Sequence, residues 1–159
     1  MGAPIFFLSG GPAASNLGYR PDARILENHD VVLIGYRGVD GMSKLDIDNV
    51  FKSSGGALFD KSSIAKIRES IKSGVKDLKN RGFDLDGYTM TEVIDDMEYA
   101  RQQLNYNRVH LLSGSYGTRL AQIYAYRYPE SISRSLLVSV NPPGHFVWEP
   151  ETIDRQIEY

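Results

Sequence analysis

One serine stands between a predicted strand and a predicted helix, and this placement constrains the chain more than any other feature. The mainly apolar run 109–112 predicts a strand, and Leu120, Ile123 and Tyr124 recur at helical spacing further on. Between them lies Ser113-Gly114-Ser115-Tyr116-Gly117, which is rich in small residues. A strand that passes into a helix over so few residues needs a sharp turn, and such a turn lifts the Ser115 hydroxyl above the edge of a sheet.

Four short apolar runs predict four strands, at residues 5–8, 31–34, 108–112 and 135–138. The runs are apolar without strict alternation, which is typical of parallel strands that are buried on both faces. Stretches with helical periodicity separate them. We therefore predict an α/β protein with about four parallel strands, covered by helices on both sides.

Three helices are readable between the strands. Residues 62–79 carry apolar side chains at spacings of three and four. Thr89 and Glu92 fit a capping box at the start of a second helix. The helix behind Ser115 ends at Tyr128, because Pro129 cannot continue it. The glycine-bearing polar stretch 41–60 is predicted to be a surface loop.

Composition excludes several classes of function. The chain has 159 residues, a net charge of −2 and no cysteine. Disulfides, thiolate chemistry and cysteine zinc sites are thereby excluded, and no basic surface for nucleic acid is expected. No apolar run approaches the roughly 20 residues that span a bilayer, so membrane insertion is not expected. No targeting segment is recognised, and the compartment stays open. Neither a metal-ligand cluster nor a phosphate-binding glycine loop is present, so we expect no metal and no cofactor.

Several motifs follow one another along the chain in an order that resembles one branch of the α/β-hydrolases. This branch comprises the proline iminopeptidases and tripeptidyl aminopeptidases, the serine peptidases of clan S33. Residues 8–13 look like the family's Gly-Gly-Pro-Gly loop, and residues 35–43 are similar to its Asp-x-Arg-Gly-x-Gly-x-Ser stretch. Residues 113–119 match the elbow Gly-x-Ser-Tyr-Gly-Thr-Arg. Residues 127–130 and 141–143 follow as they do in the family.

The sequence departs from the family pattern at three positions. Ala13 and Ser113 stand where glycine is usual, and Gly35 stands where the family has aspartate. Serine is small, but it does not share glycine's backbone freedom.

The resemblance implies a partial α/β-hydrolase fold. Residues 1–141 would be a partial core, and residues 142–159 would begin the cap region. Family members have further strands before this start, and a cap and last strands after this end. The aspartate and histidine of the catalytic triad sit on those last strands. On this interpretation the chain is an internal fragment of a longer enzyme.

The resemblance also implies roles for three residues. Ser115 would be the nucleophile, and the backbone N–H of Tyr116 would be one donor of the oxyanion hole. The second donor would come from the glycine loop. Pro12 has no N–H, so the N–H of Gly11 is the preferred donor and that of Gly10 is the second choice. The plainer interpretation is that both segments are ordinary tight turns.

Three histidines are candidates for the base. We expect His29 at the surface and His110 to be a hydrogen-bonded histidine within the sheet. His145 is the only histidine after Ser115, but no acid is placed to orient it. The sequence therefore gives no convincing base.

Three hypotheses about function follow. The first is a serine aminopeptidase that forms an acyl-enzyme on Ser115 and is inactive as this isolated chain. The second is an esterase or another acyl hydrolase with the same elbow, because fold does not fix substrate. The third is a catalytically silent fragment or binding module. The expected partners are a peptide or small acyl substrate and either a complementing C-terminal segment or a second copy that pairs with exposed sheet edges. Substrate preference and oligomeric state stay open.

Overall fold

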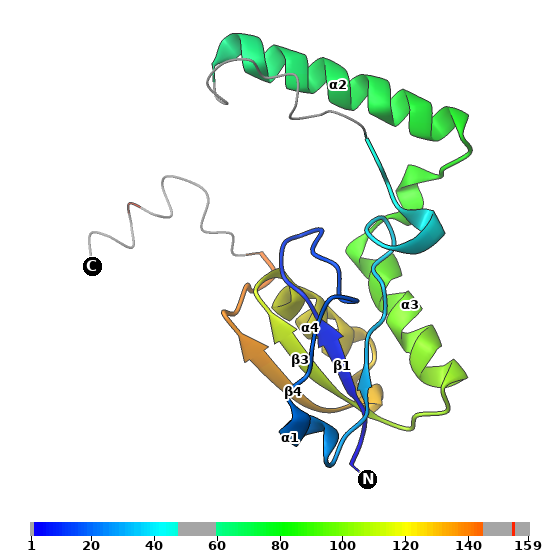
Figure 1. Ribbon diagram of the computed structural model, residues 1–159, viewed down its shortest axis with the longest axis vertical. Helices are drawn as coiled ribbons and strands as arrows, with labels where there is room; N and C mark the ends of the chain where they lie inside the picture. The colour runs from blue at the N-terminus through cyan, green and yellow to red at the C-terminus, as the bar shows by residue number, and fades with distance from the viewer. Residues whose placement is uncertain (1, 48–59, 145–153, 155–159) are drawn as a thin grey trace.

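The computed structural model describes residues 2–47, 60–144 and Asp154. Its helices and strands are β1 (Ile5–Leu8), α1 (Ala23–Leu26), β2 (Val31–Val32), α2 (Lys61–Asn80), α3 (Met90–Gln103), β3 (Val109–Gly114), α4 (Tyr116–Arg127) and β4 (Ile132–Val138). Three short 3-10 turns join them, at Gly41–Ser43, Leu85–Gly87 and Pro129–Ser131. The strands form one parallel sheet in the order β2-β1-β3-β4 (Figure 1), which confirms the predicted α/β class.

The register of the two central strands positions the rest of the molecule. Leu8, the last residue of β1, pairs with Ser113 near the end of β3. Because the strands are parallel, the glycine loop after β1 and the turn after β3 leave the sheet at the same edge. The two predicted site segments therefore lie side by side, although about a hundred residues separate them in sequence.

The hydrophobic core lies on one face of the sheet. Alternate side chains of β1 and β3, among them Phe6 and Leu111, point to this face and are fully buried. They pack against Ile94 and Met97 of α3 and against Tyr124 of α4. These helices cover the sheet in the way that parallel strands require.

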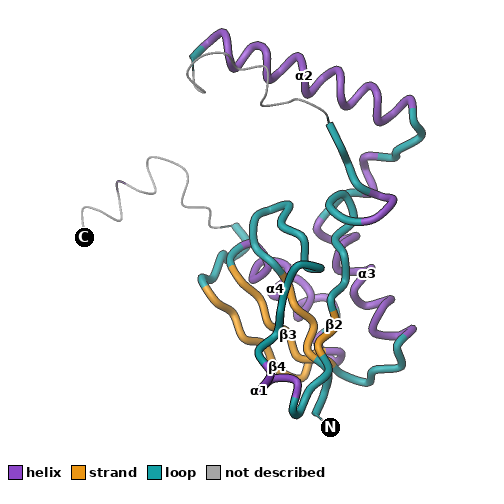
Figure 2. The backbone as a smooth tube through the Cα atoms, viewed as in Figure 1, coloured by secondary structure: helices purple, strands orange, loops and turns teal. Residues whose placement is uncertain are grey.

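The other face of the sheet carries less cover from helices in the described part of the chain. Tyr19 stacks on Phe7 there, with ring centroids 3.8 Å apart. Among the described residues, α1 is the only helix on this side. It has four residues and is too short to run along the whole of β4 (Figure 2). Leu136 and Val138 of β4 are consequently 60% and 52% exposed. In the described part of the chain, helices therefore flank the sheet on both sides, but they cover the second face less fully than the first.

Several boundaries differ from the sequence-based expectation. Strand β2 spans only Val31 and Val32, which pair with Ile5 and Phe6, so it is shorter than the predicted strand 31–34. Helix α2 agrees with its prediction and stands well away from the sheet (Figure 1). Most of the predicted loop 41–60 and most of the predicted cap region 142–159 fall outside the described residues. None of the described helices is long and apolar enough to cross a bilayer.

A buried carboxylate ties α3 to α4 and to the turn before β4. Glu98 accepts hydrogen bonds from the Arg101 guanidinium, the Gln102 amide and the hydroxyls of Tyr124 and Ser131, at 2.6–3.2 Å. Burial alone would raise its pKa, but these bonds outweigh burial and lower the pKa to about 2. The ionised form is therefore the one that the fold stabilises.

We expect Glu98→Gln to lower the free energy of unfolding by about 2–4 kcal/mol at neutral pH, because the charge opposite Arg101 is lost in a buried site. The folded pKa lies below the ordinary value of 4.5, so this contribution is present above pH 4.5 and is lost as the pH falls toward 2. Urea unfolding between pH 7 and pH 3 measures it. The control is Glu130→Gln, since Glu130 pairs with Arg108 in a bridge whose carboxylate is 90% exposed, and no measurable change is expected. Equal losses in both variants would contradict the assignment.

The first turn of α4 approaches the end of β1 closely. A Cβ atom added to Gly117 would lie 2.2 Å from the carbonyl oxygen of Leu8 and 2.7 Å from that of Ser9. Backbone atoms cannot yield at such distances without moving the helix or the strand. Only glycine fits here.

Gly117→Ala should therefore destabilise the protein by about 1–3 kcal/mol through overpacking, which exceeds the gain of up to about 1 kcal/mol from alanine's helix propensity. Gly114→Ala is the matched control three residues earlier, because a Cβ there meets no atom within 4 Å. Thermal or urea unfolding of the two variants measures the difference. If Gly117→Ala leaves the free energy of unfolding unchanged, α4 packs against the end of β1 less closely than the structure indicates.

Candidate active site

Ser115 occupies the turn between β3 and α4 with an unusual backbone conformation. Its φ is 49° and its ψ is −121°, a region that residues other than glycine rarely adopt. The residue is exposed, and its hydroxyl makes no capping hydrogen bond to the helix that it precedes. The side chain is thus presented to solvent, and the strained backbone is held by its surroundings.

Neighbouring groups fix this turn from both sides. The backbone N–H of Ser115 donates to the carbonyl oxygen of Val138 at 2.9 Å. The buried Thr118 hydroxyl donates to the Ser115 carbonyl oxygen at 2.6 Å and accepts from the N–H of Asn141 at 2.8 Å. Ser113, which stands at the family's glycine position, is buried and donates its hydroxyl to the Leu136 carbonyl oxygen at 3.2 Å. The end of β4 therefore helps to hold the strained residue.

The glycine loop after β1 lies directly against the serine. A Cβ on Gly10 would be 3.1 Å from the Ser115 Cβ and 3.6 Å from its Oγ. Gly11 has a φ of +112°, and a Cβ there would lie 2.8 Å from the Ala13 nitrogen. Both positions therefore favour glycine, Gly10 for close approach and Gly11 for its conformation.

Two side chains that the sequence did not single out hold this loop in place. Asn16 is fully buried; its Oδ1 accepts from the Ser9 N–H at 2.6 Å, and its Nδ2 donates to the Ile34 carbonyl oxygen at 2.7 Å. The Tyr36 hydroxyl donates to the Ser9 carbonyl oxygen at 3.3 Å, and burial raises the pKa of this phenol. Nothing in the sequence marks Asn16, because an asparagine in a polar loop has no pattern that separates a buried bridge from a surface residue.

The arrangement is suited to stabilising a negative charge beside Ser115. Among the described residues, the backbone N–H groups of Gly11 and Tyr116 have no hydrogen-bond acceptor. Tyr116 is also the first residue of α4, where helix N–H groups are unpaired and the helix dipole favours an anion. The roles of Ser115, Gly11 and Tyr116 in catalysis stay predictions.

The described histidines lie far from the serine. His110 is the second residue of β3 and Ser115 directly follows the strand, so their Cα atoms are about 16 Å apart along it. His29 lies beside His110, with ring centroids 5.3 Å apart. Neither can act as a base on Ser115 in this arrangement. His145 falls outside the described residues.

Both histidine environments differ from our expectations. His29 is half-buried, and its Nδ1 lies 2.8 Å from the Ala3 carbonyl oxygen, so it is not a plain surface residue. The His110 Nδ1 is buried with no hydrogen-bond partner in the described part of the structure, so the expected satisfied histidine is not observed. Burial, with smaller contributions from His29 and Arg134, lowers the pKa of His110. Its neutral form is therefore favoured.

Residues 2–47, 60–144 and 154 contain no cluster of three or more histidine or carboxylate side chains that could hold a metal ion.

Comparison with known proteins places the chain in a family. A solved structure of an alpha/beta fold family hydrolase from Bacillus anthracis str. Sterne is similar, with 14% sequence identity and a TM-score of 0.47; the match covers 99% of this chain and 46% of that one. The chain thus spans about half the length of that structure. No curated protein matches the sequence. The sequence profile described as "alpha/beta hydrolase fold" matches residues 3–155. The chain therefore belongs to the alpha/beta hydrolase fold family.

Proposed function

We propose that this chain carries the nucleophile of a serine hydrolase that cleaves peptide bonds near a free N-terminus. The observation that carries the proposal is the exposed Ser115 hydroxyl on a strained turn, with the glycine loop against it. The preference for a peptide bond rests on the likeness of the glycine loop and the elbow to the proline iminopeptidase type.

In the proposed reaction, Ser115 Oγ attacks the carbonyl carbon of the scissile bond and its proton passes to a histidine base. The carbonyl oxygen becomes an oxyanion, which accepts hydrogen bonds from the N–H groups of Gly11 and Tyr116. Each such donor is worth about 3–4 kcal/mol in the transition state. Collapse expels the amine, which takes the proton from the histidine, and water then releases the acyl group from Ser115.

The base and its orienting acid are proposed to come from polypeptide other than the described residues. His29 and His110 lie at the opposite end of the strands, which supports this requirement. The described part of the chain then supplies the nucleophile and the oxyanion donors, and a complementing segment supplies the proton acceptor.

Fluorophosphonate labelling of this chain, followed by intact mass analysis, tests the role of Ser115. We expect slow labelling of the chain alone and faster labelling when imidazole is added, because imidazole can replace a missing histidine base. Ser115→Ala should abolish the mass gain. Ser133→Ala, which removes an exposed serine of β4, should retain it. Rapid labelling without imidazole would contradict the proposal that the base comes from polypeptide other than the described residues. If Ser115 is not labelled in saturating imidazole, its proposed role as the nucleophile is wrong.

Substrate class is tested on a preparation that also contains the complementing segment. We expect turnover of aminoacyl and short peptidyl anilides with a free N-terminus, and a marked loss when the amine is acetylated. Simple p-nitrophenyl esters serve as the comparison. If only the esters are turned over, the protein is an esterase and the peptidase proposal is refuted.

A further inference from the structure

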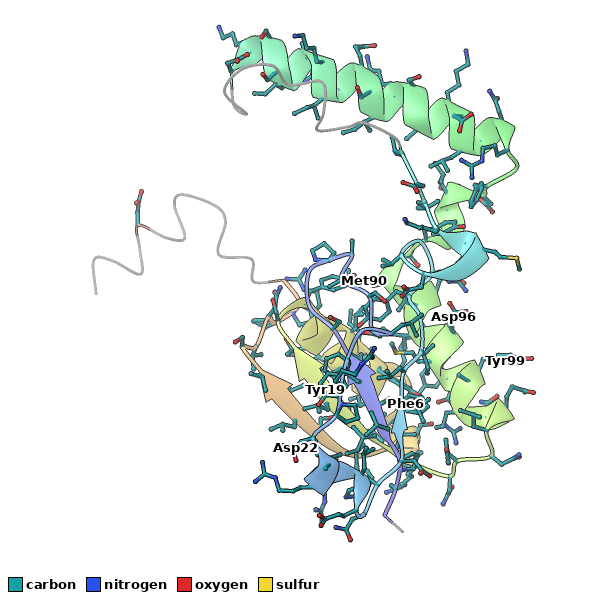
Figure 3. All side chains as sticks on the ribbon, in the orientation of Figure 1. Phe6, Tyr19, Asp22, Met90, Asp96 and Tyr99 are labelled. Carbon is teal, nitrogen blue, oxygen red and sulfur yellow. The ribbon has the colours of Figure 1, made fainter. Side chains whose placement is uncertain are left out.

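A cavity of about 400 Å³ lies at the amino end of the sheet, on the face that α1 covers only in part. Ile25 of α1 and His29, which follows this helix, line it together with residues of β1, β3 and β4. Asp22, which caps α1, marks this end of the sheet in Figure 3. Ser115 and the glycine loop leave the sheet at the opposite end of the strands, so the cavity is separate from the candidate active site.

The strand register places an imidazole and a guanidinium next to each other in this cavity. Ile5, His110 and Arg134 are register partners across β1, β3 and β4, so their side chains point to the same face of the sheet. His29 adds a second imidazole, whose ring centroid lies 5.3 Å from that of His110. The polar part of the cavity is therefore formed by two histidines and one arginine.

This polar group has no counter-charge within residues 2–47, 60–144 and 154. The Arg134 guanidinium makes no ion pair and no hydrogen bond there. Burial is the main cause that lowers the pKa of His110, and His29 and Arg134 lower it further, as expected in a positive potential. A metal cation would be repelled by Arg134, so the group is suited to an anion.

The two nitrogens of the His110 ring differ in what they offer to a ligand. Nδ1 is buried without a partner, and a buried N–H without an acceptor is rare. We therefore assign the proton of the neutral ring to Nε2. A carboxylate in the cavity can accept from this Nε2–H and from the planar fork of the Arg134 guanidinium.

The next row of side chains supplies an apolar surface. Leu112 and Leu136 are register partners two residues beyond the polar row, and Ile25 lines the cavity with them. Leu136 is 60% exposed, so a ligand that covers it removes apolar surface from water. The two rows are about 7 Å apart along the strands, a distance that a short alkyl chain can span.

We propose that this cavity binds a small carboxylate that carries a short apolar chain. The carboxylate accepts hydrogen bonds from Arg134 and His110, and the chain lies on Leu112 and Leu136. The cavity volume of about 400 Å³ is at the low end of the range for small-molecule sites, which suits a ligand of this size. The inference does not depend on the proposed role of Ser115, because the two sites share no residue.

Ligand titrations at pH 7 followed by NMR test the site on the chain itself. The probes are hexanoate, hexanamide, which has the same chain without the charge, and acetate, which lacks most of the chain. We expect hexanoate to shift the ring signals of His110 and the backbone amide signals of Leu112 and Leu136. Hexanoate should bind at least about tenfold more tightly than either other probe. Equal binding of hexanoate and either other probe, or shifts confined to other regions, would overturn the proposal.

Two arginine variants give a matched comparison. Arg134→Gln removes the guanidinium from the cavity, so hexanoate binding should weaken at least about tenfold while hexanamide binding stays the same. Arg20→Gln is the control, because it removes the same charge from an exposed arginine that donates to the Tyr19 carbonyl oxygen and lies outside the lining. Equal hexanoate binding by both variants would show that the assignment is wrong. If Arg134→Gln does not fold, the wild-type probe series decides alone.

A second copy of the chain is the other candidate to cover this face of the sheet. Hexanoate affinity measured at low and high protein concentration, with sedimentation velocity on the same samples, separates the two. Affinity that does not change with protein concentration supports the small carboxylate. Loss of hexanoate binding as a dimer forms would assign the face to a second copy and refute the proposal.

Discussion

The close contact between the first turn of α4 and the end of β1 is the constraint on which the site depends. Gly117 allows the helix backbone to rest against the carbonyl oxygens of Leu8 and Ser9. This contact fixes where α4 begins, and with it the direction of the unpaired N–H groups at its first turn. It also brings the glycine loop after β1 against Ser115. Without it, neither the strained serine nor its neighbouring donors would have a defined position.

The supporting contacts join the segments that follow all four strands. Asn16 joins the loop after β1 to Ile34, which follows β2, and Thr118 joins the elbow after β3 to Asn141, which follows β4. Because each of these side chains is fully buried, its polar groups would be costly to leave unpaired. The carboxyl edge of the sheet is therefore held as one unit, which is what a preorganised site requires.

The sequence predicted the parts of the fold that depend on local pattern. The periodicity of residues 62–79 and the proline at 129 located α2 and the end of α4 to within about two residues. Thr89 caps α3 as predicted, but the Glu92 carboxylate pairs with Arg37 instead of completing a capping box. That choice depends on a long-range partner, which periodicity does not reveal.

The same limit applies to the site. Ser115 was recognisable because its turn needs small residues at fixed spacing, a local signal. The positions of Asn16 and Thr118 depend on which strands become neighbours, and the partners of the histidines depend on which face of the sheet stays open. Such information lies in the assembled sheet and not in any short window of sequence.

The buried phenol of Tyr36 has a consequence for the conditions in which the loop stays intact. Ionisation would replace its donated hydrogen bond to the Ser9 carbonyl oxygen with repulsion between two acceptors. Because burial raises the pKa of this group, it keeps its proton well into alkaline solution. The hydrogen bond that holds the glycine loop to Tyr36 is therefore kept in alkaline solution in which an exposed tyrosine would already be ionised.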